Sequence, residues 1–248
     1  MTTGDDSHWG TYADWVVAGA TLLLAFVAAL QDRIRAWFDS PKFEITTDTA
    51  PPCCVMVPAY SVPDGLFIAN YVFLRIRVNN VGSAAARNVE VYAHSLHRIC
   101  DDANESVKSF PPMNLKWADT NGAIYIPSIS PYMGRYCDIC HVADPARRTE
   151  AEKPRYAVPT TQTTMAFDLQ AAPNHKGHIV GPGQYLLEVR VAAENCPPIG
   201  CSIQITLQGS WNSDETTMLR DFVNIKVLKT YEMRREPWRV FFFGQWPK

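Results

Sequence analysis

The run from Trp15 to Leu30 carries no charged side chain, whereas charges are spread through the rest of the chain. A bilayer-spanning helix needs about 20 mainly apolar residues, and aromatic residues on both flanks lengthen this run. The pattern therefore predicts a short tail over residues 1–11 and a transmembrane helix with its interfacial flank over residues 12–38. Asp5, Asp6 and Asp14 precede the run, where a secretory signal would carry basic residues, so we expect an uncleaved anchor. The alternative is an apolar helix buried within a soluble fold.

Two sets of residues are expected to have separate roles in this helix. Bulky side chains would contact lipid and the interface: Trp15, Leu22, Leu23, Leu24, Phe26, Leu30 and Trp37. Small side chains would let two helices pack closely and form a homo-oligomer: Ala18, Gly19, Ala25, Ala28 and Ala29. No Lys or Arg precedes the helix, whereas Arg33, Arg35 and Lys42 follow it. Because positive charge is retained on the cytoplasmic side, this predicts a single pass through the cell inner membrane with a cytoplasmic C-terminal domain.

From Lys42 onward, apolar and polar residues alternate with a period of two, which predicts a β domain over residues 39–230. The expected strands are Phe43 to Thr47, Tyr71 to Val78, Ala86 to Tyr92, Ala123 to Ile126, Arg135 to Val142, Thr163 to Leu169, Tyr185 to Ala192, Ser202 to Leu207 and Phe222 to Leu228. Asp101 to Leu115 and Asp144 to Thr161 are expected to be long loops, which are often functional. Asp214 to Arg220 is expected to form a short helical turn.

The clearest alternation lies between Tyr71 and Tyr92. Two strand patterns are separated there by Asn79-Asn80-Val81-Gly82-Ser83, which predicts a hairpin. The segment RVNNVGSAAARNVEVY resembles bacterial adhesion-type and cell-surface immunoglobulin-like modules that carry the signature N-x-G-x-x-x-A-x-x-V-x-V. This resemblance covers about a tenth of the chain and implies an immunoglobulin-like β-sandwich without specifying an activity. The expected fold is therefore mainly β, a sandwich preceded by one transmembrane helix.

Composition limits the classes of function. Hydrophobic residues make up 47% of the chain and charged residues 19%, which is typical of a globular protein rather than a disordered one. The 23 basic and 25 acidic residues give a net charge of −2, so no general nucleic-acid-binding surface is expected.

The seven cysteines lie at irregular spacings, which is not a disulfide framework, and we expect most to be buried free thiols. Cys137-Asp138-Ile139-Cys140-His141 has the spacing of a c-type haem attachment site, but an alternating strand explains the same segment. A zinc site could combine Cys137, Cys140 and His141 with Cys196 and Cys201, although the second pair is spaced too widely for a usual zinc knuckle. We expect no bound cofactor or metal.

No phosphate-binding loop, nucleophile elbow or His-Glu-x-x-His motif is present in the sequence, so enzymatic activity is not expected. The tail over residues 231–248 is rich in aromatic and basic residues. Its aromatic members would lie in the headgroup layer or contact a partner subunit: Trp238, Phe241, Phe242, Phe243 and Trp246.

These patterns together predict a membrane-anchored, non-enzymatic binding or sensing module. Its partners would be the lipid bilayer, a second copy of the chain and an unknown protein or small ligand. It would act through oligomerisation of its transmembrane helix, as a defence or stress effector does. One alternative is a membrane-tethered metal or haem redox domain that uses Cys137, Cys140 and His141. The other is an extracytoplasmic adhesion-type module of an envelope complex.

Overall fold

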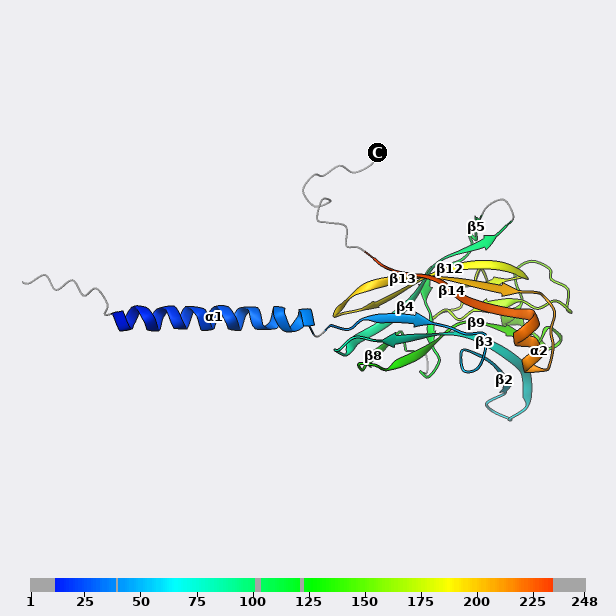
Figure 1. Cartoon of the computed structure of the whole chain (residues 1–248). Helices are drawn as coiled ribbons and strands as arrows, with labels where there is room; N and C mark the ends of the chain where they lie inside the picture. Colours follow the sequence, from blue (N-terminus) through cyan, green and yellow to red (C-terminus); the bar gives the residue numbers. More distant parts are fainter. Residues whose placement is uncertain (1–11, 39, 101–103, 121–122, 234–248) are drawn as a thin grey trace, which may run out of the picture. The chain divides into compact units, whose positions relative to one another are not determined.

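The computed structural model describes residues 12–38, 40–100, 104–120 and 123–233, with the side chains of residues 32–38 excepted. The chain divides into two compact units, Met1–Ser40 and Pro41–Lys248 (Figure 1). The first contains one helix, and the second is mainly β.

Helix α1 spans Tyr12–Phe38 and includes the whole uncharged run. Its large apolar side chains are exposed, with Trp15 at 66% and Phe26 at 62% of their full accessible area. By length and composition, Tyr12–Gln31 is able to cross a membrane, and a signal sequence meets the same criteria. None of the residues from Tyr12 to Gln31 is buried.

The strands described in the second unit form two antiparallel seven-stranded sheets. Sheet A contains β1 (Phe43–Thr46), β2 (Cys54–Tyr60), β3 (Phe67–Asn80), β7 (Lys116–Trp117), β9 (Gly134–Ala143), β10 (Met165–Phe167) and β11 (Ile179–Val180). Sheet B contains β4 (Ala86–Ile99), β5 (Asn104–Ser106), β6 (Met113–Asn114), β8 (Tyr125–Ile129), β12 (Gly183–Ala193), β13 (Cys196–Leu207) and β14 (Val223–Glu232). In sheet A the order is β1-β3-β9-β10-β11, and in sheet B it is β14-β13-β12-β4-β5.

Alternate residues of the long strands supply the core. Leu74 and Ile76 of sheet A and Val91 and Leu187 of sheet B are fully buried members of one continuous hydrophobic cluster, which also contains Trp117. Because side chains on successive strand residues point to opposite faces, this period-two burial is the pattern that the sequence predicted.

The predicted hairpin between Tyr71 and Tyr92 is wrong. β3 pairs with β1, β2 and β9 in sheet A, whereas β4 pairs with β5, β6, β8 and β12 in sheet B. The segment between them carries the chain from one sheet to the other. The buried Asn80 side chain fixes this crossover: its amide donates to Ala84 O (2.7 Å) and Ile129 O (3.0 Å), and its oxygen accepts from Gly82 N (3.1 Å) and Lys42 N (3.2 Å).

Several expected elements differ from those observed. β2 was not predicted, and β3 and β4 are longer than expected, because Pro58 and exposed ends obscure the alternation. The expected loop from Asp101 to Leu115 contains β5 and β6. The loop from Asp144 to Thr161 contains two 3-10 helices, Pro145–Arg147 and Glu150–Glu152. The predicted helical turn is confirmed, as α2 (Glu215–Thr217) leads into a π-helical turn, Met218–Phe222.

Candidate functional site

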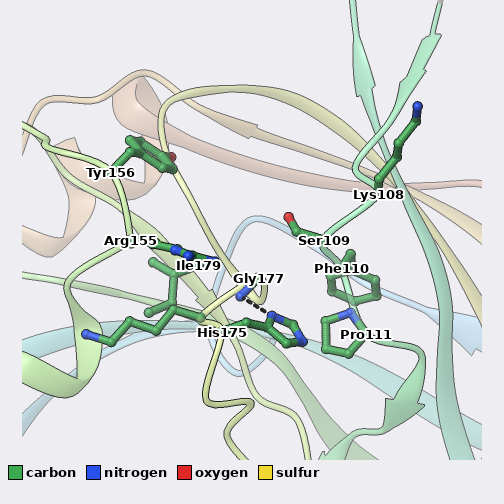
Figure 2. Close-up of a pocket in the computed structure, with 10 residues that line it drawn as sticks. Lys108, Ser109, Phe110, Pro111, Arg155, Tyr156, His175, Gly177 and Ile179 are labelled. Carbon is green, nitrogen blue, oxygen red and sulfur yellow. Dashed lines mark hydrogen bonds between the residues drawn. The ribbon is translucent and has the colours of Figure 1, made fainter.

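A cavity of about 550 Å³ opens among three loops of the β unit (Figure 2). The first wall is Lys108–Pro111 between β5 and β6, the second is Arg155–Tyr156, and the third is the segment 175–177 with Ile179 of β11. We call this cavity the basic pocket. The two segments expected to be long loops supply two of its three walls.

The first and third walls touch at Gly177. A Cβ added there would lie 1.8 Å from Ser109 O, so only glycine allows the two loops to approach this closely. Gly177 N donates to His175 Nδ1 at 3.0 Å, as the dashed line in Figure 2 shows. Because Nδ1 is an acceptor, the neutral His175 ring carries its hydrogen on Nε2, where it is a donor. Lys176, with a positive φ of 53°, adopts a backbone conformation that is costly for a lysine.

The side chains that line the basic pocket are cationic or neutral, and none is a carboxylate. Lys108 and Arg155 are exposed, and neither has a hydrogen-bond or ion-pair partner among the described residues. Lys176 is held by a hydrogen bond from its Nζ to Glu150 O at 2.8 Å. The pocket thus presents an excess of positive charge in a chain whose net charge is −2.

The remaining surface of the pocket is apolar. Phe110 is buried and packs edge-to-face on Phe167, with ring centroids 5.1 Å apart. Pro111 and Ile179 continue this surface, while the ring of Tyr156 is 53% exposed at the opposite wall. The arrangement suits a small ligand with an apolar part and a negative charge.

A second cluster of titratable groups lies on sheet A beneath the 144–162 loop. His141 of β9 donates from Nδ1 to Asp168 Oδ1 (3.0 Å), and its Nε2 lies 3.8 Å from Glu152 Oε1. Burial lowers the pKa of His141, but the two carboxylates outweigh it and the net pKa is raised. The Tyr71 ring lies edge-on to the imidazole, with ring centroids 5.5 Å apart, and burial together with the neighbouring Glu152 raises the pKa of Tyr71.

The structure does not bring the cysteine candidates into one site. Cys137 and Cys140 are fully buried on β9 of sheet A, whereas Cys196 and Cys201 lie on β13 of sheet B. Burial raises the pKa of Cys137 and of Cys140 well above the usual range, which favours neutral thiols over the thiolates that bind metals. Within the described part of the chain, no three His, Cys, Asp or Glu side chains are grouped to hold a metal. The prediction of buried cysteines is confirmed for Cys53, Cys54, Cys137, Cys140 and Cys201.

We expect thiol labelling of the native protein to modify Cys100 first. Cys100 is exposed, whereas burial raises the pKa of Cys201 to about 12 and that of the half-buried Cys196 to about 11. Mass spectrometry after brief treatment with a maleimide should find label on Cys100, and on Cys137 or Cys140 only after unfolding. Fast labelling of Cys137 in the native chain would contradict the observed packing.

The bulky residues proposed for anchoring and the alanine and glycine residues proposed for helix packing all lie on α1. Their side chains are described, with one exception. Trp37 is within α1, but its side chain lies outside the described residues. The aromatic tail residues also lie outside the described residues: Trp238, Phe241, Phe242, Phe243 and Trp246. Sequence reasoning did not predict the basic pocket, because its cations come from three segments that are distant along the chain.

The fold and the pocket define a mainly β protein with one apolar N-terminal helix and a cationic ligand-sized cavity. Comparison with protein-family models and with curated proteins found no match to the chain.

Proposed function

We propose that this chain is a single-pass membrane protein whose β unit is a non-enzymatic binding module, with the basic pocket as its ligand site. The observation that carries the proposal is the 27-residue helix α1, whose large apolar side chains between Tyr12 and Val27 are exposed. Exposed side chains of this size are costly in water and are stabilised in a bilayer. A helix that remains attached would tether the β unit to a membrane.

The β unit is proposed to be an immunoglobulin-like sandwich. Two antiparallel sheets contribute to one core, and the chain crosses between them at Asn80, which supports this assignment. Sandwiches of this type bind ligands with the loops at their ends, and the basic pocket is built mainly from loops. Arg33, Arg35 and Lys42 after the helix favour an inner-membrane protein with a cytoplasmic β unit.

Ligand binding is proposed to act through association of α1 with a second copy of itself. Ala18, Gly19, Ala25, Ala28 and Ala29 would provide the contact, since small residues let helix backbones approach closely. At Gly19 nothing lies within 4 Å of the position a Cβ would occupy, so this surface is open to a partner helix.

The membrane assignment predicts that charges within α1 release the chain from lipid. Each arginine at the centre of a spanning helix costs about 2.5–3.5 kcal/mol of insertion free energy, so the double variant Leu23→Arg, Phe26→Arg should lose stable insertion. The measurement is the fraction of full-length protein that remains with membranes after alkaline carbonate extraction. The wild type should stay with the membranes.

A matched double variant, Leu23→Ala, Phe26→Ala, removes the same bulk without adding charge and should remain in the membrane fraction. Intact-mass analysis of the membrane-bound wild type should find residues 12–38 still attached. A mature protein cleaved after α1, or a full-length chain soluble without detergent, would overturn the proposed function.

A further inference from the structure

We infer that the basic pocket binds a nucleoside phosphate, a small soluble ligand that combines a phosphate chain with a planar aromatic ring. This inference rests on the proposed function and names the ligand class of its site. Two independent features of the pocket carry it, donors that have no partner among the described residues and an apolar surface within a cavity of nucleotide size.

The donors match phosphate. Arg155 has no partner among the described residues, and His175 holds a ring N–H available through the hydrogen bond at its Nδ1. Lys108 has no partner there either, but its side chain extends away from the other residues that line the pocket (Figure 2). Phosphate oxygens are strong acceptors that pair with guanidinium and ammonium groups through short, charge-assisted hydrogen bonds. Because no carboxylate lines the pocket, a cationic ligand would meet only like charge there.

A second cavity of about 540 Å³ shares Arg155 and Tyr156 with the basic pocket. Arg148 lines this cavity, and its buried Nε has no hydrogen-bond partner in the described part of the chain, although another nitrogen of the same guanidinium donates to Gln162 O. Together the two cavities have room for a chain of more than one phosphate that passes Arg155.

The apolar slot matches a nucleobase. Phe110 is fixed by Phe167 and forms a rigid surface with Pro111 and Ile179. The exposed ring of Tyr156 stands at the other wall, where a base can stack on it (Figure 2). The volume of about 550 Å³ lies in the range of pockets that enclose ligands of this size, about 300–1,000 Å³.

The test is calorimetric titration of the full-length protein in nanodiscs of neutral phospholipid with three probes, adenosine diphosphate, adenosine and pyrophosphate. We expect saturable binding of the diphosphate at one site per chain, with each half-ligand bound at least about tenfold more weakly. Arg155→Gln should weaken the diphosphate about tenfold because it removes a charged donor, and Tyr156→Ala about tenfold because it removes a stacking surface. Arg147→Gln is the matched control, since Arg147 lies on the same loop but outside both cavities, over the Phe67 ring.

Absence of saturable diphosphate binding would overturn the inference, and so would pyrophosphate binding as tightly as the diphosphate. Equal weakening by Arg147→Gln and Arg155→Gln would show general electrostatic attraction and would also overturn it. The titration is repeated in nanodiscs that contain anionic phospholipid. An unchanged affinity supports a soluble ligand, and displacement of the diphosphate shows that lipid headgroups occupy the pocket instead. A chain that stays outside nanodiscs contradicts the membrane tether, and the same titration of that soluble chain still decides the ligand class.

Discussion

Replacing Asn80 with alanine should lower the free energy of unfolding by about 3–5 kcal/mol, because it removes four hydrogen bonds at once, one to the buried Ile129 carbonyl and three to partly buried backbone groups. The Asn80 side chain is fully buried and makes four hydrogen bonds to backbone atoms of four different residues. Its removal would affect the start of β1, the crossover from β3 to β4 and the end of β8 together. Chemical denaturation of the detergent-solubilised chain, followed by tryptophan fluorescence, measures the change.

Asn79→Ala is the matched control for this prediction. Asn79 is the preceding residue of the same strand, but its side chain is half-exposed and, among the described residues, bonds only Thr46 Oγ1, at 3.2 Å. Its replacement should cost less than about 1 kcal/mol, the usual range for a partly exposed hydrogen bond. Similar losses for the two variants would show that Asn80 does not fix the crossover.

The same residue explains where sequence reasoning succeeded and where it did not. Alternation correctly identified β3 and β4 and the faces they bury, since burial depends on a local period of two. Whether two successive strands share a sheet depends on long-range pairing, which alternation does not encode. The segment from Asn79 to Ser83 therefore predicts a hairpin turn, whereas in the structure the Asn80 side chain links the residue before β1, the crossover and the end of β8.

The candidate site shows the same limit. The Cys137 to His141 segment has the local spacing of a haem or metal motif, yet β9 contains a bulge opposite Leu74 and Arg75 that keeps both thiols in the core. Arg155 and Lys176 are 21 residues apart in the sequence, and only folding places them in one pocket. The expected long loops were the one signal in the sequence that pointed to this region.

Replacing His141 with phenylalanine should destabilise the protein by about 2–4 kcal/mol near pH 6, because the buried Asp168 loses its cationic partner. The groups that face the imidazole are Asp168, Glu152, Asp138, Lys116 and His178, and the carboxylates dominate. The net pKa of His141 is raised in the folded state, so the folded protein binds its proton more tightly than the unfolded chain. This stabilisation is complete below the unfolded pKa of about 6.5 and is lost as the pH rises through the folded value.

The difference in unfolding free energy between wild type and His141→Phe should therefore shrink as the pH rises above 6.5. Asp168→Asn should remove the same pH dependence, and the double variant should be clearly less destabilised than the sum of the two single variants, because the residues act as a pair. His94→Phe provides the opposite sign: burial and Arg190 lower the pKa of His94, so its titration costs stability as the pH falls below 6.5. Denaturation curves at several pH values measure all four variants. If the difference in unfolding free energy between wild type and His141→Phe instead grows as the pH rises, His141 is neutral in the folded chain. In that case its charge does not stabilise Asp168 and Glu152.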